Sequence, residues 1–182
     1  MDDRLPGIRP RQTLWRRLDR TARLGFPSAL TVLLLLLFAA PFRLPGQAEL
    51  QTAAALCCVF FWSIHRPGSM PPPAVFLVGL LADLLGFAPP GVGVITLLAA
   101  HGIAVRWRRE LLRLGFLLSW VAFGAVAVAL AGLHWALTCL LTFRLLPAAS
   151  ALFQATLAAG LYPLLAVLLA RAHRTIAEPA NA

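Results

Sequence analysis

Long runs of apolar residues, separated only by short breaks, fill most of this chain of 182 residues. A helix that crosses the hydrocarbon core of a bilayer needs about 20 predominantly apolar residues. Since 60% of the residues are hydrophobic and only 13% are charged, about half the charged share of a soluble domain, a water-soluble fold is not expected. The runs cover about 24 to 42, 47 to 64, 72 to 88, 91 to 105, 114 to 133 and 148 to 170. The sequence therefore predicts an all-α fold, a polytopic membrane bundle of about six transmembrane helices that forms one domain over 24–172.

The stretch 134–147 does not fit clearly into one of the six predicted spans. It is still apolar, and it fits an interfacial or re-entrant segment or a continuation of the fifth run, so a five-span bundle stays open as an alternative. The third and fourth runs are short, and they meet at Phe87-Ala88-Pro89-Pro90-Gly91. Two prolines and a glycine in so short a connection predict a tight helical hairpin.

The arginines predict the orientation of the bundle. All 16 basic residues are arginine, and with a cytoplasmic amino terminus fourteen of them fall on the cytoplasmic side. Only Arg43 and Arg144 fall on the opposite side. Because loops rich in Lys and Arg stay in the cytoplasm, both termini are predicted to be cytoplasmic. The net charge of +9 does not indicate nucleic-acid binding, since no recognition motif or aromatic-basic strand pattern accompanies it.

Two groups of arginines are predicted to contact anionic lipid head groups and to fix the topology. Residues 1–23 form an Arg-rich cytoplasmic tail whose second half predicts an amphipathic helix on the membrane surface, with a solvated basic tail as the alternative. Residues 173–182 are predicted to form a second cytoplasmic tail. The predicted anchors are Arg16, Arg17, Arg20 and Arg23 in the first tail, and Arg106, Arg108, Arg109 and Arg113 after the fourth run.

Asp83 is an acidic residue inside an apolar run, where burial of a charge costs about 2.5 to 3.5 kcal/mol on insertion scales. It therefore needs a partner or a polar pocket. Gly79, Asp83 and Gly86 stand at positions i, i+4 and i+7, so they share one helix face on which the glycines permit another helix to come close. One interpretation is an interhelical site that binds a partner or ligand. The alternative is a structural Asp that hydrogen-bonds a neighbouring helix or turn.

A proline-rich connector, His65 to Pro73, follows the aromatic run Phe60-Phe61-Trp62. Proline fixes backbone angles, so the connector is predicted to be rigid, and the aromatic run is predicted to form a belt at the membrane interface. The connector is either a partner-binding surface that includes Trp62, Arg66 and Pro67 or a plain stiff turn.

The remaining polar residues predict no catalytic residue, metal or cofactor. His101 and His134 lack the spacing of metal ligands and are interpreted as packed or interfacial side chains. Gln154 and Thr156 are interpreted as interhelical hydrogen bonders. The serines lack a nearby His or Asp and a nucleophile-elbow motif, so hydrolase and transferase chemistry are not expected.

The order of these parts resembles the MreD family of rod-shape-determining membrane proteins. Phe61-Trp62 followed by Arg66-Pro67, then Pro73, the stretch from Phe76 to Gly86 and the Pro90-Gly91 turn carry the resemblance. These residues cover about a third of the chain, while the size and six-span layout extend the match over nearly all of it. The long Arg-rich amino terminus is additional to the family pattern.

The resemblance implies a non-enzymatic scaffold of the bacterial elongation machinery in the inner membrane, which supports rod shape and peptidoglycan synthesis. The implied partners are an MreC-like bitopic protein, MreB filaments, and the RodA and penicillin-binding-protein synthases. The family also resembles, in fold, the substrate-binding subunits of energy-coupling-factor vitamin transporters, and such a subunit is the alternative function. A small lipid-modifying enzyme is a third alternative. Its chemistry would need a second acid or a nucleophile beside Asp83, and the run around Asp83 contains neither.

Overall fold

The structure, a computed structural model, describes residues 14–40, 46–86 and 88–177, with side chains from 25 onward to 172. Within these ranges the fold is all-α, as predicted, with no β-strand. One short 3-10 turn, η1 (Pro67–Ser69), interrupts the series of α-helices. The helices are α1 (Leu14–Ala39), α2 (Gln47–His65), α3 (Pro72–Leu85), α4 (Val92–Arg113), α5 (Phe116–Thr142) and α6 (Ala149–Ala177).

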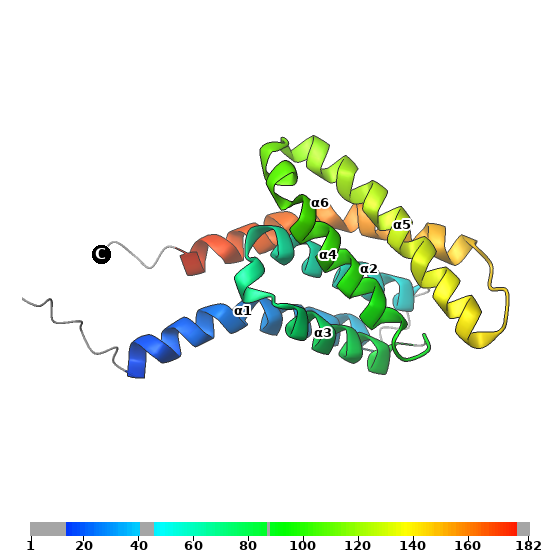
Figure 1. Ribbon diagram of the computed structural model, residues 1–182, viewed down its shortest axis with the longest axis horizontal. Helices are drawn as coiled ribbons and strands as arrows, with labels where there is room; N and C mark the ends of the chain where they lie inside the picture. The colour runs from blue at the N-terminus through cyan, green and yellow to red at the C-terminus, as the bar shows by residue number, and fades with distance from the viewer. Residues whose placement is uncertain (1–13, 41–45, 87, 178–182) are drawn as a thin grey trace, which may run out of the picture.

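The helices run back and forth along an elongated bundle (Figure 1). The start of α1, η1, the α4–α5 connection and the end of α6 lie toward one end, which we call the terminal end. The start of α2, the α3–α4 turn and the α5–α6 connection lie toward the other end, the turn end. Alternate connections thus share an end of the bundle.

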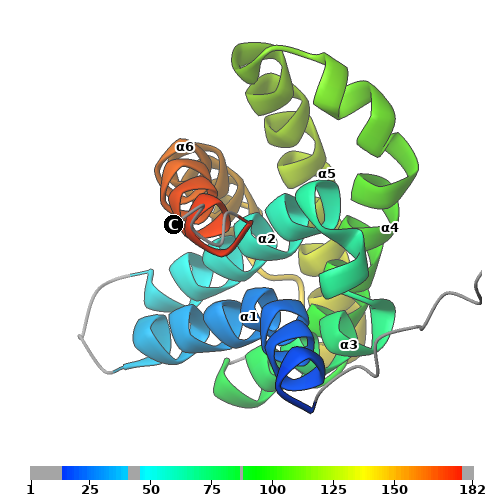
Figure 2. The same cartoon turned by 90° about the vertical axis from the view of Figure 1, so that its left-hand side faces the viewer.

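Helix α2 forms the centre of the bundle. Every residue from Ala53 to Ile64 is buried, and α2 packs against α1, α4 and α6 (Figure 2). Phe60 of α2 lies 4.9 Å from Phe123 of α5 between ring centroids, and Phe123 stacks on Tyr162 of α6 at 4.1 Å. Aromatic contacts of this kind add about 0.5 to 1.5 kcal/mol per pair beyond area burial. These contacts join α2 to the later helices α5 and α6.

The aromatic run after the second apolar segment lies in this core. Trp62 is only 1% exposed and Phe60 is fully buried, so the prediction of an interfacial aromatic belt is wrong. The reason is that α2 is surrounded by other helices over its whole second half, which leaves these rings no outer surface.

The connections follow the prolines and glycines. Helix α3 ends at Leu85 and α4 begins at Val92, which confirms the predicted hairpin. After α2 the chain makes the η1 turn, and α3 starts with proline at its first positions, where a missing N–H costs no helical hydrogen bond.

Three helices differ in extent from the apolar runs. Helix α1 is continuous from Leu14, so the predicted surface helix and the first run form one helix. Helix α4 extends to Arg113, and α5 extends to Thr142, so 134–142 continue the fifth helix and only 143–148 connect it to α6.

Two helices in the described part are long and apolar enough to cross a membrane: α5, Phe116–Thr142, and the Ala149–Ala172 portion of α6. Gly25–Ala39 and Pro72–Leu85 are shorter apolar helices. Only 22% of the apolar window of α5 is buried. An apolar helix that is mostly uncovered needs lipid or another protein around it, because contiguous apolar patches of this extent are rare on soluble monomers.

Candidate functional site

Asp83 caps the first turn of α4. Its Oδ2 accepts a hydrogen bond from the backbone N–H of Gly91 at 2.7 Å and a longer one from Val94 at 3.3 Å, and its Oδ1 accepts one from Gly93 at 2.7 Å. The first N–H groups of a helix have no partner within the helix, and they carry the positive end of its dipole. The carboxylate of α3 therefore compensates for its burial by satisfying α4.

The α3–α4 contact requires glycine on both helices. A Cβ on Gly79 would lie 2.7 Å from Cα of Val94, and a Cβ on Gly93 would collide with the carboxylate of Asp83. Real Cβ atoms do not approach so closely, so the two backbones meet only because both side chains are absent. The face predicted to receive another helix is occupied by α4 of the same chain.

The six residues predicted to bind a partner do not form one surface. Gly79, Asp83 and Gly86 lie toward the turn end, where Gly86 ends α3. Trp62, Arg66 and Pro67 lie at the terminal end, where Trp62 is buried, Arg66 ends α2 and Pro67 begins η1. For Asp83 the geometry matches the alternative interpretation, a structural carboxylate bonded to a neighbouring helix.

The predicted arginine anchors divide into two kinds. Arg108 Nε donates a hydrogen bond to the backbone oxygen of Ile64, so this side chain satisfies a carbonyl in the last turn of α2. Arg106, Arg109 and Arg113 are exposed, and Trp107 beside them is 61% exposed. Arg16, Arg17, Arg20 and Arg23 lie in the first turns of α1, and their side chains are outside the described residues.

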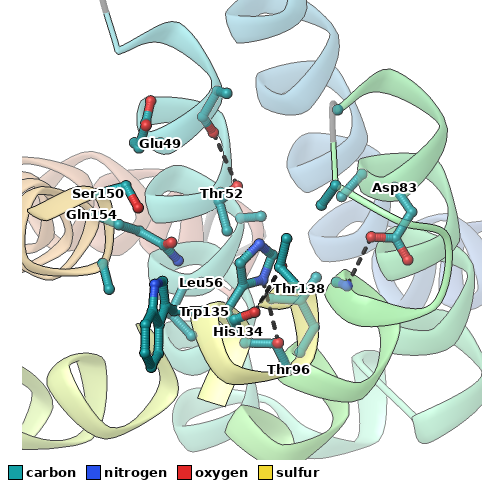
Figure 3. A pocket seen from close by; sticks show the side chains of 18 of the residues that line it. Glu49, Thr52, Leu56, Asp83, Thr96, His134, Trp135, Thr138, Ser150 and Gln154 are labelled. Atoms are coloured by element: carbon teal, nitrogen blue, oxygen red, sulfur yellow. Dashed lines mark hydrogen bonds between the residues drawn. The ribbon is translucent and has the colours of Figure 1, made fainter. Parts of the chain in front are cut away.

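A cavity of about 200 Å³ opens between α2, α4, α5 and α6 at the turn end (Figure 3). Leu56, Leu97, Trp135 and Leu146 supply apolar wall, and Trp135 is held by a hydrogen bond from its Nε1 to the backbone oxygen of Leu146 at 3.1 Å. Asp83 reaches one side of the cavity. The other polar lining residues are Glu49 and Thr52 of α2, Thr96 of α4, His134 and Thr138 of α5, and Ser150 and Gln154 of α6.

His134 stands in the middle of these side chains (Figure 3). Its Nδ1 lies 3.4 Å from Oγ1 of Thr96, and that hydroxyl already donates its proton to the backbone oxygen of Val92 at 2.7 Å. A hydroxyl has one proton to give, so in this contact Nδ1 of His134 is the donor. In the neutral ring Nε2 is then a hydrogen-bond acceptor.

Gln154 brings an unsatisfied donor to the same cavity. The residue is 5% exposed, and its Nε2 has no hydrogen-bond partner in the structure. An unpaired buried amide costs about 1 to 3 kcal/mol, so native structures rarely keep one without a use.

A second polar pair lies deeper in the bundle. Ser63 Oγ lies 2.8 Å from Nδ1 of His101 and donates to the backbone oxygen of Val59 at 2.6 Å. Ser63 is fully buried, and His101 is 8% exposed. A substrate has no access to this hydroxyl, so the pair is a buried interhelical contact. Among the described residues no group of three or more His, Cys, Asp or Glu side chains is placed to hold a metal ion.

The sequence did not reveal the cavity. Glu49 lies inside the second apolar run, where no sequence motif gives it a role. The sequence predicts a packed or interfacial side chain for His134 and an interhelical hydrogen bonder for Gln154. They come from three helices, so no sequence spacing connects them. The one signal was that Glu49 and Gln154 are polar residues within apolar runs and that His134 directly follows one.

Comparisons with known proteins give no relative. No protein-family model matches the chain, and neither a curated protein nor a solved structure matches it.

Proposed function

We propose that this chain is a non-enzymatic membrane scaffold of the MreD type, which crosses the bacterial inner membrane six times and holds an MreC-like single-span partner. In this proposal it supports rod shape and peptidoglycan synthesis, together with MreB filaments and the RodA and penicillin-binding-protein synthases. The basis is the resemblance of Phe76–Gly86 and its flanking turns to that family, combined with the surface that this stretch presents.

Membrane embedding is supported by the exposed apolar side chains. Leu33 of α1, Leu84 of α3, Leu117 of α5 and Leu164 of α6 are each exposed by 60% or more. Burial of a leucine side chain away from water contributes about 1.5 to 3 kcal/mol, so lipid contact at many such positions is strongly favourable. The alternation of connections between the two ends fits six crossings with both termini on one side.

The outer face of α3 is the surface that we propose for the partner. Phe76, Leu77, Leu80 and Leu84 lie on one side of the helix and are 46%, 63%, 36% and 72% exposed. The adjoining side, with Gly79 and Asp83, is fixed to α4 by hydrogen bonds and close packing. A rigid apolar face loses little conformational entropy on binding, which favours association with another helix. We therefore place the single-span partner on this outer face.

Depletion in the native bacterium tests the function. Cells depleted of this protein should become round and lyse, with or without added vitamins in the medium. Rods of normal length and width after depletion would contradict the scaffold proposal.

The cavity at the turn end favours a second candidate, the substrate-binding subunit of a vitamin transporter. A polar ligand needs several convergent hydrogen-bonding groups, and five helices, α2 to α6, supply them here. In that case depletion should leave cell shape normal and make growth depend on a supplement.

A further inference from the structure

The polar groups around the cavity between α2, α4, α5 and α6 are mostly acceptors. Thr52 donates its proton to the backbone oxygen of Ala48, Thr138 to that of His134, and Ser150 to that of Pro147. Each hydroxyl oxygen keeps lone pairs, and Nε2 of His134 is an acceptor in the tautomer that Thr96 imposes. A ligand that carries N–H or O–H donors therefore matches this lining.

The charge of the cavity is negative. Among the described residues that line it, Glu49 and Asp83 are the carboxylates, and none is Arg or Lys. The carboxylate of Asp83 already accepts hydrogen bonds from the backbone N–H groups of Gly91 and Gly93. The structure gives Glu49 no ion pair with any residue that it describes. A cation is the natural complement of this carboxylate, and an anion is disfavoured.

Gln154 places a second requirement on the ligand, which is a hydrogen-bond acceptor. Its Nε2 is a buried donor without a partner, so the ligand must bring an acceptor oxygen to it. Figure 3 shows Gln154, His134 and Glu49 on three different helices around the cavity, with Glu49 set apart from His134. A hydroxyl has both an acceptor lone pair for Gln154 and an O–H donor for His134.

We propose that this cavity binds a small organic amine that carries a hydroxyl group on an apolar ring, with the ammonium at Glu49, the hydroxyl between Gln154 and His134, and the ring against Trp135. The volume of about 200 Å³ and the largely apolar wall suit a single ring. This inference goes beyond the scaffold function. For the second candidate function, the substrate-binding subunit of a transporter, it names the class of ligand.

Four matched probes test the inference on the full chain in nanodiscs of zwitterionic phosphatidylcholine. Tyramine has the ring, the amine and the hydroxyl. Phenethylamine lacks the hydroxyl, 4-hydroxyphenylethanol lacks the amine, and 4-hydroxyphenylacetate carries an anion in its place. Equilibrium dialysis should show tyramine binding at least fivefold more tightly than each of the other three. No measurable tyramine binding, or equal binding of tyramine and 4-hydroxyphenylacetate, would overturn the inference.

Variants of Glu49 and Gln154 test which residue binds the ammonium of tyramine and which binds its hydroxyl. Glu49→Gln should remove the preference for tyramine over 4-hydroxyphenylethanol, and Gln154→Leu should remove the preference for tyramine over phenethylamine. Gln51→Leu is the matched control, because Gln51 is equally buried at 5% exposure with an unpartnered Nε2 but does not line the cavity. It should leave all four affinities unchanged. Preferences that persist in both Glu49→Gln and Gln154→Leu would contradict the assigned site. Binding in nanodiscs is independent of cell shape, so failure here does not decide the scaffold function.

Discussion

The backbone nitrogen of Gly93 lies 2.7 Å from Oδ1 of Asp83, so a carboxylate on α3 holds the first turn of α4. The same side chain borders the cavity at the turn end. Asp83 thus fixes the position of α3 relative to α4. Through this contact it also positions one wall of the cavity and the outer face of α3.

Removal of this carboxylate should destabilise the hairpin. Asp83→Leu loses hydrogen bonds to three N–H groups, and since a hydrogen bond to a charged group contributes about 1.5 to 3 kcal/mol, we expect a loss of at least about 2 kcal/mol in unfolding free energy. Asp83→Asn keeps one acceptor oxygen and should lose less. Thermal unfolding of the purified protein in detergent measures both. Glu110→Gln is the control, because Glu110 makes only a 3.9 Å contact with Arg113. Equal melting temperatures for all four proteins would contradict the capping role.

Gly79→Ala should separate α3 from α4. The added methyl group meets the backbone of Val94, which cannot rotate away, so we expect a cost of about 1 to 3 kcal/mol despite the better helix propensity of alanine. Gly124→Ala on α5 is the matched control, since a Cβ there meets nothing within 4 Å. It should leave the melting temperature unchanged or raise it. A melting temperature for Gly79→Ala at or above that of the control would show that the helices are not in close contact.

Arg108 and Arg109 should differ although they are neighbours. Arg108→Gln removes the donor to the carbonyl of Ile64 at the end of α2, and we expect it to lower the unfolding free energy by about 1 kcal/mol. Arg109 is exposed, so Arg109→Gln should have no measurable effect on stability. Chemical denaturation in mixed micelles compares the two. If the two variants unfold at the same denaturant concentration, the hydrogen bond from Arg108 to Ile64 does not contribute to stability.

The two ends of the bundle should lie on opposite sides of the membrane. In a variant with Cys139→Ser, a cysteine at Leu145 should react with a membrane-impermeant maleimide added to spheroplasts, because Leu145 is 91% exposed at the turn end. A cysteine at Leu112, beside Arg113 at the terminal end, should react only after the membrane is opened. Cys57 and Cys58 are buried and give little background. Labelling of Leu112→Cys in sealed spheroplasts would reverse the predicted orientation.

The helices were predictable because their signals are local. Apolar runs, the Pro-Pro-Gly turn before Val92 and the prolines before α3 each act on adjacent residues. The structure has one helix for each apolar run and the hairpin at the predicted turn, while α1, α4 and α5 extend beyond their runs. The end of α5 was ambiguous, since 134–142 are apolar without a turn signal, and helix continuation is resolved only by the fold.

The site was less predictable because its residues meet across helices. The spacing of Gly79 and Asp83 correctly indicated one close-packed face, but it could not indicate whether α4 or another protein covers that face. Trp62 belongs to an aromatic run that fits both a lipid interface and a core. The cavity combines Glu49 of α2, His134 of α5 and Gln154 of α6, and only tertiary structure brings these three helices together around it.

Photo-crosslinking in living cells tests the scaffold proposal most directly. Benzoylphenylalanine at Leu77 and Leu84, which are seven residues apart on the outer face of α3, should crosslink to a single-span membrane protein identified by mass spectrometry. Val121 and Val128 on α5 have the same spacing and are 59% and 58% exposed, so they are matched control positions that should give no protein crosslink. A partner captured from both α3 positions and from neither α5 position is the predicted result. No capture from α3, or capture of the same partner only from α5, would contradict the account.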